Sequence, residues 1–111
     1  SAVGMIENLE AMLAGGQDNA LLRFSLGNAC FQAERFAEAA THLSSAVAQD
    51  PEYSAAWKLY GRSLAENGRH AEALEVFDQG IGVAEKRGDI QAAKEMRVFR
   101  KRAARSLDEG G

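Results

Sequence analysis

The strongest constraint on the fold is an internal repeat with a spacing of 34 residues. A shift of the chain by 34 places Gly27 on Gly61 and Arg35 on Arg69, and it places the Ala-Glu-Ala run at 37–39 on the identical run at 71–73. Apolar positions follow the same shift, in the pairs Leu26 with Tyr60, Cys30 with Leu64, Ala40 with Leu74, Leu43 with Phe77, and Val47 with Ile81. A repeat unit of this size cannot bury its apolar face alone, so the copies must stack on one another.

The composition predicts that the repeating units are helical. Pro51 is the only proline, and Ala, Leu, Glu, Gln and Arg fill long stretches with few β-branched residues, which favours helix. Breaks lie at 15–18, 33–35, 50–52, 67–69 and 86–89, and segments with helical periodicity lie between them. The sequence therefore predicts an all-α fold of about six short helices, joined by tight links that make neighbours antiparallel.

The pattern within the repeat resembles a known family. The second copy contains Trp57, Tyr60, Gly61, Leu64, Ala73 and Phe77, and the first contains Leu26, Gly27, Cys30, Ala39, Leu43 and Pro51. In spacing and residue type these positions are similar to the tetratricopeptide repeat (TPR) across residues 20–87. The departures are Arg23 in the tryptophan position of the first copy and Glu85 in the proline position of the second. The resemblance implies a helix-turn-helix repeat array, an α-solenoid.

The resemblance also implies how a single TPR domain over residues 1–111 is organised. Residues 2–14 are similar to the second helix of a half repeat, 20–53 and 54–87 are full repeats, and 89–106 is a C-terminal capping helix. The 34-residue frame turns Met5, Leu9 and Met12 of the first helix inward. The last helix fits only with a slip of one residue, which turns Ala92, Met96 and Phe99 inward.

Gly61 lies within a predicted helix, where glycine costs about 1 kcal/mol relative to alanine. It shares one helix face with Trp57, Tyr60 and Leu64. In the family the glycine lets the two helices of a repeat cross closely, so the resemblance implies a small residue opposite Gly61, either Ala73 or Gly80. We expect Gly61→Leu to destabilise the protein by overpacking this crossing.

Composition and motifs argue against several classes of function. Cys30 is the only cysteine, which excludes an internal disulfide or thiolate cluster and suits the cytoplasm. No signal peptide or membrane span is evident. His42 and His70 lie in no catalytic or metal-binding motif, and we expect surface or interhelical roles for both. The sequence thus predicts neither an enzyme nor a cofactor.

Charge is distributed unevenly along the chain. The first 85 residues carry 5 Lys and Arg against 12 Asp and Glu, whereas residues 86–111 carry 8 against 4. The basic residues of the last helix form one stripe, made up of Lys94, Arg97, Lys101 and Arg105. Because the chain as a whole is acidic and the stripe lacks aromatic residues, we expect neither nucleic acid nor membrane as a partner. The stripe either solvates the cap or docks an acidic partner.

The resemblance implies a peptide-binding surface on the first helix of each repeat, the concave face of the array. The positions carried over are Leu21, Phe24, Asn28, Phe31 and Gln32, and then Ala55, Lys58, Arg62, Ala65 and Glu66. We assign peptide binding to Leu21, Phe24, Asn28, Phe31, Lys58 and Arg62. This mixture suits a peptide of a partner protein that presents an apolar side chain beside an acidic residue or a C-terminal carboxylate.

Two alternatives stay open at this point. Lys58 and Arg62 repel each other at i, i+4, and either a bound anion or Glu66, four residues beyond Arg62, relieves that repulsion. Phe24 and Phe31 lie two turns apart on one face and belong either to a groove or to the core. A different class of function is self-association into a homo-oligomer, in which Phe24, Phe31 and the terminal helix meet a second copy.

Overall fold

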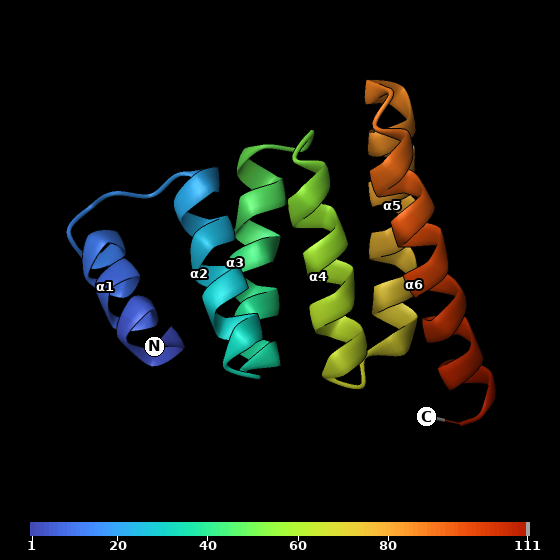
Figure 1. Ribbon diagram of the computed structural model, residues 1–111, viewed down its shortest axis with the longest axis horizontal. Coiled ribbons are helices and arrows are strands. Elements are labelled where there is room, and N and C mark those ends of the chain that lie inside the picture. Colours follow the sequence, from blue (N-terminus) through green and yellow to red (C-terminus); the bar gives the residue numbers. More distant parts are fainter. Residues whose placement is uncertain (111) are drawn as a thin grey trace.

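The computed structural model describes residues 1–110, apart from the side chain of Ala2, and this part of the chain is all-α (Figure 1). Its six helices are α1 (Ala2–Ala14), α2 (Ala20–Gln32), α3 (Phe36–Gln49), α4 (Ser54–Glu66), α5 (His70–Arg87) and α6 (Ile90–Asp108). The expected breaks separate these helices, although α5 continues through Lys86 and Arg87 and leaves a link of only Gly88 and Asp89. Gly88 adopts the left-handed conformation, with φ of 76°, that glycine tolerates best at the end of a helix.

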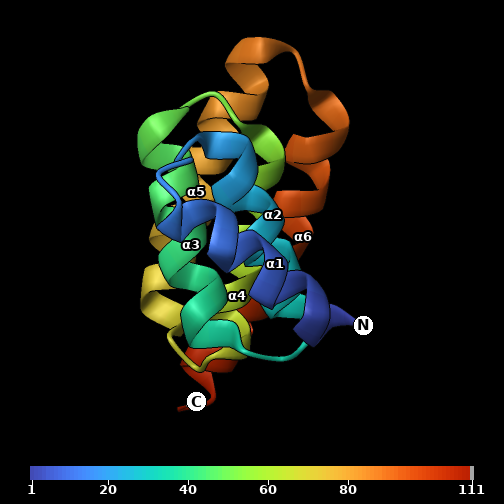
Figure 2. The same cartoon turned by 90° about the vertical axis from the view of Figure 1, so that its left-hand side faces the viewer.

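The helices stack in chain order from α1 to α6, as Figures 1 and 2 show from two directions. The stack curves because its two layers differ. Helix α2 contacts α4, and α4 contacts α6, whereas α3 and α5 make no contact with each other in the described part of the chain. The first helices of the repeats therefore lie closer together than the second helices. The surface of α2, α4 and α6 is consequently the inner, concave face of the array, and we call it the inner face.

Each repeat is closed by a glycine that faces a large buried side chain. A β-carbon on Gly27 would lie 2.5 Å from Cγ of Leu43, and one on Gly61 would lie under 3.0 Å from the Phe77 ring. Leu43 and Phe77 are both fully buried. The expectation that Gly61 faces Ala73 or Gly80 is therefore wrong: the missing side chain makes room for an aromatic ring.

Gly80 belongs to a different contact from the one expected. A β-carbon on Gly80 would lie 2.6 Å from Sδ of Met96 and 2.8 Å from Cβ of Trp57. Met96 lies in α6 and Trp57 in α4, so Gly80 lets α5 approach both helices at once. This glycine therefore closes the junction between the second repeat and α6.

The first helix buries a narrower stripe than expected. Ile6 is 1% exposed, and Leu9 and Leu13 pack partly buried against the core. Met5 and Met12, which the repeat frame turns inward, are instead 56% and 40% exposed. The reason is that α3 lies between α2 and α4, whereas α1 contacts α2 alone among the described residues. One neighbouring helix covers one stripe and leaves the adjacent stripe in solvent.

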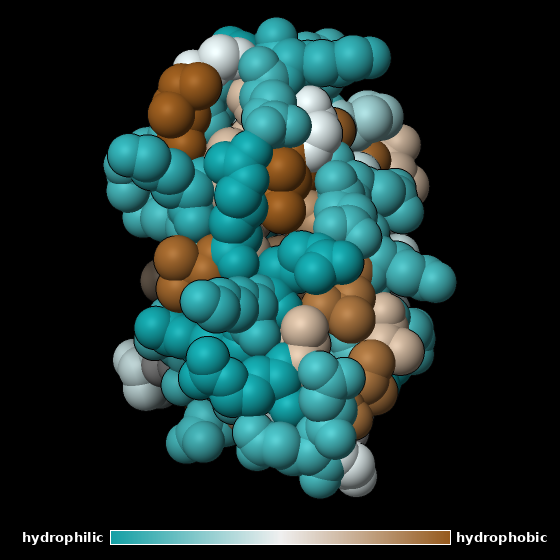
Figure 3. Space-filling view, turned by 90° about the vertical axis from the view of Figure 1, so that its right-hand side faces the viewer, coloured by the Kyte–Doolittle hydropathy of each residue, from teal (hydrophilic) through white to brown (hydrophobic). Residues whose placement is uncertain are grey.

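Helix α6 packs against α5 and α4 and closes the other end of the described array. Met96 is fully buried as expected, but Ala93 and Ala103 are the other buried residues, while Ala92 and Phe99 are only partly buried. The outer face of α6 is mostly hydrophilic, with separate apolar patches (Figure 3). All four residues of the basic stripe are exposed there. This distribution is what a terminal helix with one packed and one solvated face requires.

Candidate functional site on the inner face

The centre of the inner face is an arginine between two aromatic rings. The Cζ atom of Arg62 in α4 lies 4.9 Å from the ring centroid of Phe31 in α2 and 4.6 Å from that of Phe99 in α6. Both distances are within the range of a cation–π interaction. All three side chains are partly buried. The packing of three successive first helices therefore fixes the guanidinium in place without neutralising its charge.

Lys58, one turn before Arg62, has a different environment. Its Nζ donates to Oε1 of Glu95 in α6 at 2.8 Å, and this hydrogen bond is the main reason that the pKa of Glu95 is lowered. A further hydrogen bond from Gln91 lowers the pKa in the same direction. The charge of Lys58 is thus matched within the chain, by a residue that sequence reasoning did not single out.

Glu66 does not take the part expected of it. No ion pair joins Arg62 to Glu66 in residues 1–110. The repulsion between Lys58 and Arg62 is relieved instead by Glu95 at Lys58 and by the two rings at Arg62. The reason is tertiary: α6 supplies both Glu95 and Phe99, whereas a sequence pattern within α4 could offer only Glu66.

The remaining predicted site residues lie along α2. Phe24 stacks on Tyr53 with ring centroids 4.9 Å apart, and Phe31 meets Phe36 edge to face at 5.2 Å. Both phenylalanines pack partly buried against the core, so each belongs partly to the core and partly to the surface. Leu21 is 65% exposed and Asn28 is exposed. The structure therefore gathers Phe31, Lys58 and Arg62 around α6 and leaves Leu21 and Phe24 at the opposite end of α2.

Three residues of the inner face were missed in the sequence. Phe99 was assigned to the buried face of the cap, while Glu95 and Arg102 were not singled out. Arg102 lies one turn after Phe99, with its Cζ 5.4 Å from the Phe99 ring centroid. All three belong to α6, where the 34-residue frame no longer holds. The repeat pattern that located the other residues therefore gave no signal for these.

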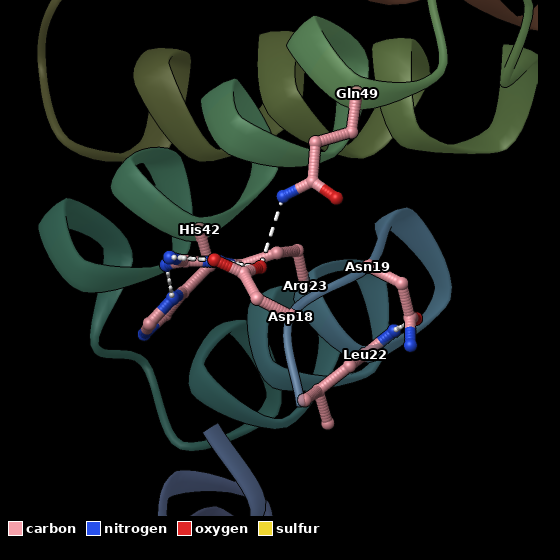
Figure 4. A network of polar contacts seen from close by, with 6 residues as sticks. All are labelled: Asp18, Asn19, Leu22, Arg23, His42 and Gln49. Carbon is pink, nitrogen blue, oxygen red and sulfur yellow. Dashed lines mark hydrogen bonds and ion pairs between the residues drawn. The ribbon is translucent and has the colours of Figure 1, made fainter. Parts of the chain in front are cut away.

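A second polar cluster surrounds Arg23, the residue in the tryptophan position (Figure 4). Arg23 donates from Nε and Nη2 to the two carboxylate oxygens of Asp18 at 2.9 and 3.0 Å, and Gln49 of α3 donates to the same carboxylate at 2.9 Å. The hydrogen bond from Arg23 is the largest cause that lowers the pKa of Asp18 to about 2. Arg23 thus ties the α1–α2 link to the first repeat.

His42 completes this cluster on the side of α3. Its Nδ1 lies 3.2 Å from Nη1 of Arg23, and since the guanidinium can only donate, the imidazole nitrogen accepts. Burial is the main cause that lowers the pKa of His42, and the positive charge of Arg23 acts in the same direction. In the second repeat the corresponding position is Trp57, whose Nε1 donates to the carbonyl of Pro51 at 2.8 Å. The cluster has an interhelical, structural role.

Other kinds of chemistry find little support in residues 1–110. No group of His, Cys, Asp and Glu in this part of the chain could hold a metal ion. Burial raises the pKa of the Cys30 thiol, which makes it a poorer nucleophile. Among the helices that the structure describes, each is too short or too polar to cross a bilayer. The inner face is therefore the best candidate for a functional surface.

Comparison with known proteins agrees with this architecture. The model of the tetratricopeptide repeat family matches residues 6–53 and 24–90. The TPR repeat-containing protein PA0015 of Pseudomonas aeruginosa is 49% identical over 102 residues, which are 92% of this chain and 97% of that protein. The solution structure of protein BPP2914 from Bordetella parapertussis is 46% identical, with a TM-score of 0.78 over 91% of this chain and 88% of that one.

A more distant structure shares the fold. A crystal structure of MamA has a TM-score of 0.66 at 21% identity, over 95% of this chain and 68% of that one. The repeat pattern, the crossing glycines and these similarities lead to one assignment. The chain belongs to the tetratricopeptide repeat family, whose arrays are in general non-catalytic scaffolds for protein–protein interaction.

Proposed function

We propose that this chain is a non-catalytic interaction domain that binds a peptide segment of a partner protein along its inner face. The observation that carries the proposal is Arg62, whose guanidinium lies between the rings of Phe31 and Phe99 and forms no ion pair within residues 1–110. A cation fixed in this way has lost little entropy still to be lost on binding, and it can offer charge-assisted hydrogen bonds to an acidic group.

The rest of the peptide surface would follow α2 and α4. Leu21 and Phe24 offer exposed or partly exposed apolar surface at one end of α2, and Asn28 offers an amide between them and Arg62. The proposed ligand is a segment with an apolar side chain beside an acidic residue or a C-terminal carboxylate. Lys58 takes part through its pair with Glu95, because an acidic ligand must displace that carboxylate to reach the lysine.

The lone cysteine supports a proposed location in the reducing environment of the cytoplasm. Cys30 is fully buried within the first repeat, where it fills core space rather than forming a bridge. We assign no cofactor, nucleic acid or membrane to the domain, and the inner face supplies the proposed contact with a protein partner.

The proposal is tested by selecting peptides from a random library on the immobilised chain and mapping the best binder by amide chemical shifts. We expect the shifted amides to lie in α2 and α4 and the amides of α3 and α5 to stay unchanged. Arg62→Gln should weaken binding about tenfold, the loss of roughly one charge-assisted hydrogen bond. Lys86→Gln, at an exposed site in the last turn of α5, removes the same charge and should leave binding unchanged.

Failure to select any peptide, or shifts confined to α3 and α5, would contradict the proposal. The double variant Lys58→Glu with Arg62→Glu extends the test, since it should keep the helical content and abolish binding of peptides with an acidic end. Circular dichroism of each variant separates loss of binding from loss of fold.

A second candidate function, self-association, rests on apolar side chains at the two ends of the described array. Val3, Met5 and Met12 are exposed on α1, and Val98 and Leu107 are exposed on α6. Phe24 and Phe31 do not share this exposure, since each packs on a ring of its own chain. Sedimentation equilibrium at micromolar to millimolar concentration tests this candidate. A strict monomer over that range would contradict it.

A further inference from the structure

A cavity of about 370 Å³ opens between α4, α5 and α6, next to the central arginine. Arg62, Ala65 and Glu66 line it from α4, His70 and Phe77 line it from α5, and Phe99, Arg102, Ala103 and Ser106 line it from α6. Because Arg62 and Ala65 are positions of the inner face, the cavity adjoins the surface proposed to bind a peptide.

Comparison of the two repeats shows why the space is open. Phe31 and Phe36 pack edge to face in the first repeat, and the residues 34 positions later are Ala65 and His70. Replacing a phenylalanine by an alanine removes a whole ring from the wall, and replacing the other by a histidine makes the wall polar. The second repeat thus has a cavity where the first has two aromatic side chains in contact.

The polar groups around the cavity are mostly positive. Arg62 and Arg102 form no ion pair within residues 1–110, and both guanidinium carbons lie within 5.4 Å of the centroid of the Phe99 ring. Glu66 is the only acidic residue in the lining. His70 begins α5, so the positive end of that helix dipole also lies at the cavity.

One buried atom in the lining lacks a partner. Nδ1 of His70 is inaccessible to solvent and has no hydrogen-bond partner. A buried polar atom without a partner costs free energy unless something satisfies it. In the tautomer with a proton on Nδ1, this atom can donate to an acceptor that enters the cavity.

We propose that this cavity is a carboxylate pocket, in which an acid group of the bound segment lies between Arg62 and Arg102 and accepts a hydrogen bond from His70. The pocket deepens the proposed function, on which it rests, because it specifies an acidic residue at the α4–α6 end of the inner face. The acid is an aspartate or glutamate side chain or a C-terminal carboxylate, since the same donors recognise each of these groups.

The test uses small probes, so that it does not depend on knowing a peptide sequence. N-acetylglutamate amide carries a side-chain carboxylate, N-acetylalanine carries a terminal carboxylate, and N-acetylglutamine amide is neutral. Each is titrated into the labelled full chain while the Nε–Hε signals of Arg62 and Arg102 and the ring signals of His70 are followed by NMR. We expect one or both acids to shift these signals about tenfold more tightly than the neutral amide. The stronger acid identifies the source of the carboxylate.

Three variants sharpen the test. Ala65→Phe restores the ring of the first repeat and should abolish probe binding by filling the cavity. Arg102→Gln, on the exposed side of the cavity, should weaken binding at least about fivefold. Lys101→Gln removes the same charge from the neighbouring, fully solvated position and should have no effect beyond that of added salt.

The pocket assignment is overturned if the neutral amide binds as well as both acids, or if Lys101→Gln weakens binding as much as Arg102→Gln. Either result, found together with library peptides that bind along α2 and α4, removes the pocket and leaves the proposed function standing. Acid probes that bind in the pocket while no library peptide binds the inner face support the pocket and contradict peptide binding.

Discussion

Gly61 and Gly82 show that the same residue type has opposite roles within helices. Gly61 faces the buried ring of Phe77, whereas a β-carbon on Gly82 would meet nothing within 4 Å. Helix propensity favours alanine over glycine at both positions. Only at Gly61 does close packing oppose that preference.

We therefore predict opposite effects of two identical substitutions. Gly82→Ala should stabilise the protein by about 0.5–1 kcal/mol through helix propensity. Gly61→Ala should destabilise it by about 1–3 kcal/mol, because the added carbon displaces a ring that is fully enclosed. Urea denaturation followed by circular dichroism measures both. A Gly61→Ala protein more stable than the parent would rule out the close crossing.

At the scale of elements, the pair of helices in the first repeat is joined by a polar cluster where the second repeat uses a tryptophan. Arg23 connects α2 to His42 of α3 and to Asp18 of the preceding link. The repeat pattern located this position but could not predict what replaces the indole. The partners come from three segments that only the folded chain brings together.

This joint should make stability depend on pH near neutrality. His42 faces Arg23 of α2, Glu10 of α1, Asp18 of the link and Glu38 of its own helix, and the net effect of burial and charge lowers its pKa below 6.5. A lowered pKa means that the unfolded chain binds the proton more readily. The contribution of His42 is therefore complete above pH 6.5 and is lost as the pH falls below that value towards the folded-state pKa.

The measurement is the free energy of unfolding between pH 5 and 7. The parent should lose stability as the pH falls, and His42→Gln, which keeps an acceptor for Arg23 but does not titrate, should show a flatter dependence. His70 is present in both proteins and serves as an internal control. Equal slopes would contradict the assignment to His42. A separate loss from Asp18 should follow at lower pH, between 3.8 and about 2.

At the scale of the whole molecule, a linear array distributes stability unevenly. Each helix draws its stability from its neighbours, and α1 has one neighbour in the described chain, whereas α4 contacts α2, α3, α5 and α6. Ile6 is the only large residue that α1 buries fully. We therefore expect α1 to open on its own, without unfolding of the centre.

Hydrogen exchange under native conditions tests this expectation. Amides of α1 should exchange through an opening of lower free energy than those of α4. Ile6→Ala should speed exchange in α1 and leave α4 close to its parent rate, while Val3→Ala, at a position 46% exposed, should change neither. Uniform protection across α1 and α4 would instead indicate a single cooperative unit.

The sequence by itself determined the features that depend on local order and on repetition. Helix positions followed from composition, breaks and apolar spacing, and the family followed from positions that recur every 34 residues. Gly27 and Gly61 were recognisable as crossing residues because both copies carry glycine at the same position. Such signals lie within one repeat, so they can be read along the chain.

The tertiary structure alone decided which side chains meet across helices. It placed Phe77 opposite Gly61, Glu95 beside Lys58, and Phe99 against Arg62, and none of these pairs follows from the repeat frame. The physical reason is that each pair spans two helices whose relative rotation is set by packing of the whole core. In α6, where the frame slips, only that packing determines which face turns inward, and this face completes the proposed pocket.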